Sequence, residues 1–273
     1  MWTVLGGIAA QTSKLRVGTG VTCPLIRTHP AIIAHAAATT ADLFGGRFFL
    51  GIGTGENLNE HILGDHWPPY ADRREMLIES IEIMRGLWEG ELFSHRGDHY
   101  VVENARIYTL PDEPPPILVA ASGPESGSLG GEHGDGLIVT SPDPAVLDAY
   151  RSAGGDGPIY GQVTVCWASN ESDAKRTLHK VWPNAGVPGD LSTELPLPRH
   201  FEQAAENVTP DALAERIPVG PDPARYLSAI REMTDAGASH VYVHQVGPDQ
   251  AGFMAFWERE LASEVVRATK ASK

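Results

Sequence analysis

Apolar and polar positions follow two periods along the chain, and the change between them predicts strands followed by helices. Six apolar stretches bounded by turn residues are typical of buried strands, at residues 15–23, 47–54, 117–122, 136–141, 159–168 and 240–246. Helical spacing lies between and beside them, at residues 2–12, 29–43, 71–88, 126–132, 144–153, 171–182, 210–216, 224–236 and 253–268. Strands that alternate with helices predict an α/β protein with a parallel sheet.

The number of strands leaves two α/β architectures open. A TIM barrel closes with eight strands, each followed by a helix, and six strands are two short of that number. A doubly wound open sheet would use six strands, but it normally carries a G-x-G-x-x-G turn after its first strand, and none follows residues 15–23. From the residues alone, barrel and open sheet are nearly even.

Two segments interrupt the alternation of strands and helices. Residues 92–108 alternate and turn at Arg96-Gly97-Asp98, which predicts an inserted hairpin. Residues 183–208 are rich in Pro and Gly without a clear period, so we expect an irregular substrate loop or lid. The rest is expected to form one domain over residues 1–273.

Composition excludes several classes of partner. The 273 residues include 21 Lys or Arg and 35 Asp or Glu, giving a formal net charge of -14 that repels nucleic acid. No apolar run approaches the roughly 20 residues that a bilayer requires, and the N-terminus lacks the pattern of a signal peptide. Cys23 and Cys166 match no disulfide or metal spacing. We therefore expect a cytoplasmic protein whose partners are small molecules, with no nucleic acid and no membrane.

The strongest chemical signal is the segment GIGTGENLNE, residues 51–60. A buried strand ends there in a Gly-spaced turn followed by Glu56 and Asn59, and ligands of α/β proteins bind at the carboxyl ends of strands. A carboxylate beside a half-buried ring can exchange protons near neutral pH. A glutamate that only caps a helix is an equal alternative.

Other strand ends carry weaker signals. Small residues end the first strand at Gly20, Val21 and Cys23, and Ser122-Gly123 and Thr140 follow two later strands. Backbone N–H groups of such turns can bind phosphate, although ordinary turns explain these residues about as often. His244 ends the last strand and is a modest site candidate. The histidines show no metal-binding pairing, so no metal is expected.

Several motifs together carry a resemblance to a known family. They are LRVGTGVTCP, HPAIIAHAAAT, GRFFLGIGTGENLNE, WPPYADRREMLIESIEIMRGLW, ILVAASGP, GEHGDGLIVTS and HVYVHQVGPDQ. Over nearly the whole chain the sequence resembles the coenzyme F420-dependent glucose-6-phosphate dehydrogenase-like group of the bacterial luciferase-like superfamily. The resemblance implies a TIM barrel, and with it coenzyme F420.

The resemblance also implies roles for single residues. Glu56 matches the glutamate that exchanges a proton with coenzyme or substrate, and Thr140 matches a pocket position near the substrate. Gly20 and Val21 match a strand-end bulge with a non-prolyl cis peptide that supports the deazaflavin ring. The other coenzyme positions are Cys23 and Asn59, facing the ring or tail, and Ser122 and Gly123 at the phosphate tail.

Two departures from the family pattern bear on function. Family members begin with a strand, a helix and a second strand that carries Ser-Asp-His and then Trp. This chain starts after these elements, so we expect an N-terminally incomplete barrel with about six of eight core strands.

The family also binds the substrate phosphate with basic side chains. Asp143 stands at the first of these positions and Gln203 near the second, while Arg216 matches the third. Such a site is a poor phosphate clamp.

The resulting hypothesis is an F420-dependent oxidoreductase, a homodimer, that moves a hydride between the deazaflavin and an uncharged alcohol or carbonyl compound rather than glucose 6-phosphate. Thr140, Asp143, Arg216 and His244 are its substrate-side candidates. One alternative is an FMN-dependent luciferase-like monooxygenase. Another is a truncated, non-catalytic cofactor-binding protein.

Overall fold

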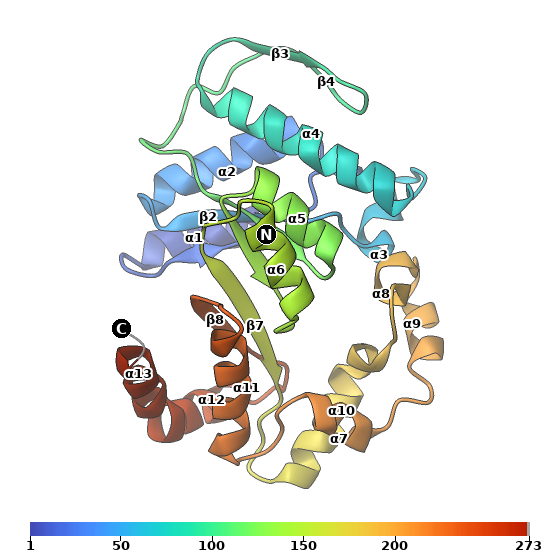
Figure 1. The fold of residues 1–273 in the computed structure, drawn as a ribbon, viewed down its shortest axis with the longest axis vertical. Helices are drawn as coiled ribbons and strands as arrows, with labels where there is room; N and C mark the ends of the chain where they lie inside the picture. The colour runs from blue at the N-terminus through green and yellow to red at the C-terminus, as the bar shows by residue number, and fades with distance from the viewer. Residues whose placement is uncertain (272–273) are drawn as a thin grey trace. The chain divides into compact units, whose positions relative to one another are not determined.

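The computed structural model describes residues 1–271, which divide into two compact units (Figure 1). The first unit contains Met1–Ile138 and Pro144–Pro158, and the second contains Val139–Asp143 and the residues from Ile159 onward. Each unit is described by itself below. Among the described residues, no helix is long and apolar enough to cross a membrane.

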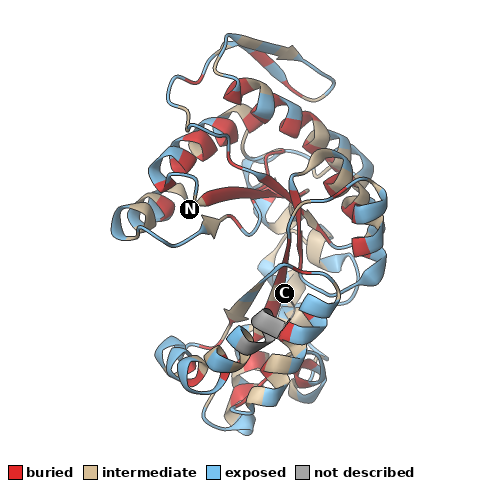
Figure 2. Cartoon of the chain, turned by 60° about the vertical axis from the view of Figure 1, so that its left-hand side comes forward, coloured by how far each residue is buried: buried red, intermediate tan, exposed pale blue. Residues whose placement is uncertain are grey.

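The first unit contains four strands of the parallel sheet, in the order β1 (Val17–Gly18), β2 (Phe48–Ile52), β5 (Ile117–Ala121) and β6 (Gly136–Val139), except for Val139, the last residue of β6. β2 is parallel to both of its neighbours, with Val17 opposite Phe48 and Leu50 opposite Ile117. β2 and β6 are buried along their whole length, as expected for parallel strands covered on both faces. Figure 2 shows this burial continuing on one side of the covering helices.

The helices of the first unit start and stop at recognisable signals. They are α1 (Trp2–Gln11), α2 (Pro30–Phe44), the single turn α3 (Asn57–Glu60) with the short η1 (His61–Leu63), α4 (Tyr70–Trp88), α5 (Pro124–His133) and α6 (Pro144–Ser152). At the start of α2, His29 Nδ1 accepts a hydrogen bond from Ala31 N, and Pro30 fills the first turn. Gly45 ends α2 in the left-handed conformation.

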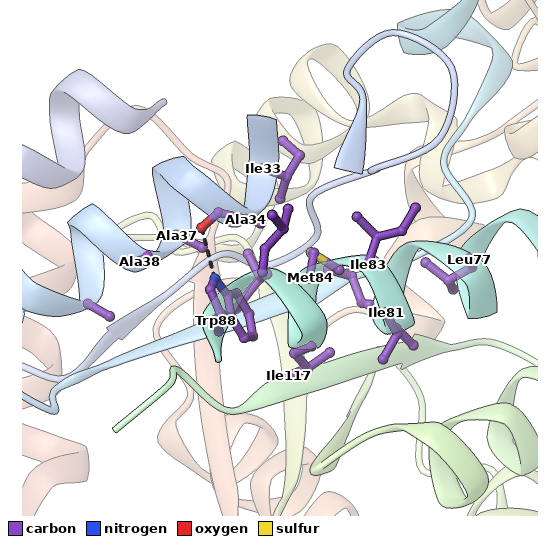
Figure 3. Close-up of a cluster of buried hydrophobic side chains, with 14 of the residues drawn as sticks. Ile33, Ala34, Ala37, Ala38, Leu77, Ile81, Ile83, Met84, Trp88 and Ile117 are labelled. Atoms are coloured by element: carbon purple, nitrogen blue, oxygen red, sulfur yellow. Dashed lines mark hydrogen bonds between the residues drawn. The ribbon is translucent and has the colours of Figure 1, made fainter. Parts of the chain in front are cut away.

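Helices α2 and α4 pack against each other within the core of this unit (Figure 3). α2 presents Ala34, Ala37 and Ala38, all fully buried, so the bulky side chains of α4 can approach closely. Trp88 of α4 donates a hydrogen bond from Nε1 to the carbonyl oxygen of Ala34, at 2.9 Å. Small residues on one helix thus accommodate large ones on the other at high packing density.

The hairpin of β3 (Phe93–Arg96) and β4 (Val101–Ala105) is bound to α4 through one buried carboxylate. Glu79 accepts hydrogen bonds from the ring Nε2 of His95 and from the backbone N–H groups of His99 and Tyr100, at 2.8–3.0 Å. Burial alone would raise the pKa of Glu79, but these hydrogen bonds outweigh it and lower the pKa. The hairpin is therefore fixed to the unit at its turn.

The second unit contains two parallel strands with regular pairing, β7 (Ile159–Val165) and β8 (His240–Gln245). Its main helices are α7 (Glu171–Val181), α10 (Pro210–Arg216), α11 (Pro223–Asp235) and α12 (Gln250–Phe256). After α12, a π-helical segment η3 (Trp257–Leu261) leads into α13 (Ala262–Ala271). The prediction of one continuous α-helix over residues 253–268 is therefore wrong in detail, because the π-helical segment interrupts it.

Two other segments differ from their predictions. Residues 183–208 were expected to be irregular, but they include three short helices, η2 (Pro183–Gly186), α8 (Leu191–Glu194) and α9 (Pro198–Ala204). Pro183 and Pro198 begin two of these helices. The N–H of a first helical residue has no partner within the helix, so proline loses no hydrogen bond there. The strand expected over residues 15–23 is also shorter, since only Val17 and Gly18 belong to β1.

Candidate active site

A β-bulge lies where the first predicted strand leaves the sheet. Gly18 is opposite Phe49 and Thr22 is opposite Ile52, so three residues of the first strand face two residues of β2. The buried Thr19 fills the gap: its hydroxyl donates to the carbonyl oxygen of Gly51 at 2.8 Å and accepts from the N–H of Gly51 at 2.9 Å. The side chain thus replaces the backbone partner that the N–H of Gly51 would have in a regular sheet, while the carbonyl oxygen of Gly51 also accepts from the backbone N–H of Thr22 at 2.8 Å.

The bulge confirms one part of the family expectation at Gly20 and Val21 and corrects another. The described residues contain no cis peptide bond, so the cis peptide expected there is wrong for this structure. A non-prolyl cis bond costs about 3 to 4 kcal/mol, and the chain makes this turn in the trans form.

The bulge presents backbone and one apolar side chain to solvent. A Cβ atom built on Gly20 would meet nothing within 4 Å, so the space beside it is open. Val21 is 50% exposed, and its Cγ1 would lie 2.9 Å from a Cβ built on Gly53. Gly53 therefore leaves room for the Val21 side chain.

Glu56 and Asn59 lie together directly after β2. Gly55 turns the chain with φ of 78°, and Glu56 then occupies the N-cap position of α3. The Glu56 side chain makes no capping bond; it accepts a hydrogen bond from Asn59 Nδ2 at 3.1 Å instead. The helix-cap interpretation thus describes the backbone of Glu56 and not its carboxylate.

The environment of Glu56 favours its protonated form. The residue is reached by solvent, yet neighbouring protein atoms desolvate the carboxylate and raise its pKa above the usual 4.5. A carboxyl group of this kind can hold and release a proton closer to neutral pH.

Cys23 lies beneath the turn at Gly55 and is 9% exposed. Burial, and next the negative charge of Glu60, raise the pKa of its thiol. Glu60 itself is buried and pairs with Arg27, with 3.4 Å between Glu60 Oε1 and Arg27 Nη2. The sequence patterns did not single out Glu60 or Arg27, because their pairing depends on contact across 33 positions of chain.

Ser122 and Gly123 form the turn before α5, as predicted, but their N–H groups already have a partner. The hydroxyl of Ser126 accepts from Ser122 N at 3.1 Å and from Gly123 N at 3.2 Å. A phosphate bound at this turn would have to share or displace that hydroxyl. Ser126 was not singled out in the sequence; it lies three residues after the N-cap Gly123, the position from which a side chain reaches back to the N-cap N–H.

The substrate-side candidates belong to the second unit. Thr140 and Asp143 are exposed in the segment after β6, and Arg216 is exposed at the end of α10. His244 is half-buried on β8, opposite Thr164 of β7, and its ring meets Trp182 edge-on with 5.3 Å between centroids. Its Nδ1 is buried without a hydrogen-bond partner. Trp182, which the sequence did not mark, gives His244 an aromatic neighbour.

The described residues contain no group of three or more His, Cys, Asp or Glu side chains that could hold a metal ion. A depression of about 520 Å³ lies between α7 and the start of α10 and is lined by Arg176, His179 and Pro210 among others. It includes none of the predicted site residues, so we do not associate it with the candidate site.

Comparison with known proteins points to the same family that the sequence resembles. Residues 1–240 match the model of the luciferase-like monooxygenase family. The chain is 35% identical over 271 residues to an F420-dependent glucose-6-phosphate dehydrogenase of Segniliparus rotundus, covering 94% of this chain and 81% of that protein. It is 37% identical over 246 residues to an F420-dependent hydroxymycolic acid dehydrogenase of Mycobacterium tuberculosis, covering 87% and 67%.

A solved structure gives the same result for the fold. An F420-dependent secondary alcohol dehydrogenase in complex with an F420-acetone adduct superposes with a TM-score of 0.86 at 25% identity, covering 95% of this chain and 82% of that one. This match confirms the luciferase-like α/β barrel fold class, and it resolves the choice between barrel and open sheet that the strand count left open. The chain therefore belongs to the luciferase-like monooxygenase family, and these three relatives in it are F420-dependent dehydrogenases.

Proposed function

We propose that this protein is an F420-dependent oxidoreductase that transfers a hydride between the deazaflavin and an uncharged alcohol or carbonyl compound. The observation that carries the proposal is the pairing of Glu56 and Asn59 immediately after β2, beside the bulge at Gly20 and Val21. The F420-dependent relatives support the choice of coenzyme.

The residues at the bulge fit a flat ring. Gly20 has open space beside it, and Val21 offers an exposed apolar surface over Gly53. When bound, the deazaflavin supplies a ring carbon that accepts or donates hydride. The turn at Ser122 and Gly123 would hold the phosphate tail once the Ser126 hydroxyl, which accepts from both N–H groups and donates to the carbonyl oxygen of Gly123, is displaced from them.

Glu56 handles the proton that accompanies hydride transfer in this proposal. Its raised pKa keeps a larger share of the carboxyl protonated, and the hydrogen bond from Asn59 orients the oxygen Oε2. A fixed, partly desolvated carboxyl is suited to give a proton to an oxygen or take one from it.

The substrate side disfavours a phosphorylated sugar. The glucose-6-phosphate enzymes of this family carry basic side chains at three phosphate-binding positions. Asp143 and Gln203 stand at or near two of these positions, and Arg216 matches the third. A dianionic phosphate near Asp143 would be repelled by its carboxylate, which lowers the affinity for a phosphorylated substrate. Relatives named for a secondary alcohol and for hydroxymycolic acid support a substrate other than a phosphorylated sugar.

The test begins with the coenzyme. Purified protein titrated separately with F420 and FMN should perturb the absorbance of F420 at micromolar concentration and leave that of FMN unchanged. Reduction of F420 is then measured with a panel of secondary alcohols and with glucose 6-phosphate. Tight binding of FMN instead would support the monooxygenase alternative, and binding of F420 without turnover of any alcohol would support the non-catalytic one.

The role of Glu56 is tested separately. Glu56→Gln should lower kcat roughly a hundredfold while coenzyme Kd changes by no more than a few fold, the range expected for loss of a general acid or base. Glu103→Gln, at an exposed glutamate on the hairpin, is the matched control and should leave kcat unchanged. Equal kcat in the Glu56 variant and the control would reduce Glu56 to a helix-cap residue.

The substrate assignment has its own variant. Asp143→Lys combined with Gln203→Lys should introduce measurable activity with glucose 6-phosphate and leave the alcohol activity within a few fold. Efficient use of glucose 6-phosphate by the unaltered chain would overturn the assignment. The homodimer and the cytoplasmic location also stay predictions; sedimentation equilibrium and cell fractionation test them.

A further inference from the structure

Helix α3 cannot hold its own orientation. It is four residues long and carries Asn59, with Glu56 at its N-cap. Isolated helices shorter than about 12 residues are marginal in water, so a single turn takes its geometry from the residues it contacts. The position of the Glu56 carboxylate therefore depends on whatever anchors this turn.

The anchor on the buried side is Glu60, which is 1% exposed. Its Oε2 accepts a hydrogen bond from the backbone N–H of Arg27 at 3.3 Å, and its Oε1 lies 3.4 Å from Arg27 Nη2. The Cys23 thiol, protonated because burial and the charge of Glu60 raise its pKa, also hydrogen-bonds to the carboxylate. Three groups of one loop thus converge on one carboxylate of α3.

The turn that precedes Glu56 rests on the same side chains. A Cβ atom at Gly55 would lie 2.6 Å from Cys23 Sγ and 3.1 Å from Glu60 Cγ. Gly55 also has a φ of 78°, which L-residues with a Cβ rarely adopt. On the other side, the N–H of Glu60 donates to the carbonyl oxygen of Glu56. The backbone of Glu56 is thereby fixed from both directions.

The loop that receives Glu60 is itself fixed by buried hydroxyl groups. Tyr100 Oη donates to the carbonyl oxygens of Leu25 and Pro24, at 3.0 and 3.3 Å. Ser80 Oγ of α4 donates to the same oxygen of Pro24 at 2.9 Å. The contacts therefore run without a break from the hairpin and α4, through this loop, to Glu60.

On the basis of the proposed function, we propose that Glu60 is a positioning residue: its buried carboxylate fixes α3, and with it Glu56, against the loop of residues 23–27 that follows the bulge. Glu60 does not reach the reacting atoms in this proposal. It acts through the orientation of Glu56.

The first test needs neither coenzyme nor substrate. Glu60→Ala should raise the hydrogen-exchange rates of the α3 amides at residues 59, 60 and 61 by about tenfold, measured by solvent-exchange NMR, because the opening free energy of the turn falls. Amides of β2 should keep their rates. Glu60→Gln keeps the shape and the acceptor for Arg27 N, so it should restore most of the protection. Unchanged α3 exchange in Glu60→Ala would overturn the proposal.

The second test separates positioning from general stability. In protein verified as folded, Glu60→Ala should lower kcat about tenfold, a cost typical of misplacing a catalytic group, while coenzyme Kd stays within about threefold. In a Glu56→Gln background the same change should cause no further loss, because it acts through Glu56. Losses that multiply in the double variant would contradict the proposal. If Glu56→Gln itself has normal turnover, the proposed role of Glu56 has failed, and the exchange rates alone decide whether Glu60 positions α3.

Discussion

The strand pairs β1–β2 and β7–β8 are both parallel, yet only one of them is regular. β7 and β8 are paired over six consecutive positions, from Tyr160 opposite His240 to Val165 opposite Gln245. β1 and β2 are paired at two positions, followed by the bulge and one isolated bridge at Thr22. The difference shows how a chain leaves a sheet while the buried N–H of Gly51 stays paired: a threonine hydroxyl substitutes for the missing backbone partner.

The two pairs contain matched residues, which makes the comparison testable. The largest effect is expected at the glycines Gly51 of β2 and Gly161 of β7. A Cβ at Gly51 would lie 2.1 Å from the carbonyl oxygen of Thr19, whereas a Cβ at Gly161 would meet the side chain of Met233. Gly51→Ala should cost about 3 kcal/mol because backbone must move, and Gly161→Ala about 1 kcal/mol because methionine adapts.

Urea unfolding of the two glycine variants measures these free energies. Coenzyme affinity should fall only in Gly51→Ala, since the bulge moves with Thr19. Equal destabilisation by the two changes would show that the bulge yields as easily as a methionine side chain.

A smaller effect is expected at the threonines. Thr19→Val keeps the volume but removes both hydrogen bonds to Gly51, so the buried N–H of Gly51 loses its partner and about 2 kcal/mol of unfolding free energy is lost. Thr164 of β7 accepts only a 3.4 Å hydrogen bond from Gln162, and Thr164→Val should cost less than about 0.5 kcal/mol. Thermal unfolding of both variants checks the order, and a larger loss at Thr164 would refute it.

The smallest expected effect is the pH dependence of the unfolding free energy that arises from Glu56, the residue that follows the end of β2. Glu56 has a raised folded-state pKa, so its contribution to stability is fully present below the unfolded value of 4.5 and is lost as pH rises through the folded pKa. The difference in unfolding free energy between the natural chain and Glu56→Gln should therefore decline as pH rises above 4.5. The slope should be shallow, because solvent reaches the side chain.

Glu79 provides a control of opposite sign. Its folded-state pKa is lowered, so its contribution is present above the unfolded value of 4.5 and is lost as pH falls through the folded pKa. Glu79→Gln should thus lose its effect as pH falls, and the slope of its unfolding free-energy difference against pH should be opposite in sign to that of Glu56→Gln. Slopes of the same sign in the two variants would mean that one of the two environments is misassigned.

The regular pair was also the more predictable one. The apolar run over residues 159–168 and the run over residues 240–246 gave β7 and β8 with ends displaced by up to three residues, because each run pairs along its length. The run over residues 15–23 has equal strand character, yet only two residues became strand. The bulge depends on a hydroxyl contact between Thr19 and Gly51, 32 positions apart, which no local pattern reports.

The candidate site divides in the same way. Glu56 and Asn59 were found from the sequence because they are three positions apart after a glycine turn, and one helical turn brings such residues together. Glu60 and Trp182 escaped notice, because a buried carboxylate and an aromatic neighbour gain their meaning from tertiary contacts with Arg27 and His244. Pro183 and Pro198 indicated a loop when read as breakers, although proline also starts helices.

Both cysteines of the chain are free and buried, and this has a practical consequence for reagents that attack sulfur. Burial raises the pKa of Cys166 to about 11, and that of Cys23 is raised as well, so both sulfurs remain protonated at neutral pH. Alkylating agents react with the thiolate, so alkylation of either cysteine requires local opening of the surrounding chain. The rate of Cys23 alkylation, measured by mass spectrometry on the natural protein, would therefore report how often the turn at Gly55 opens.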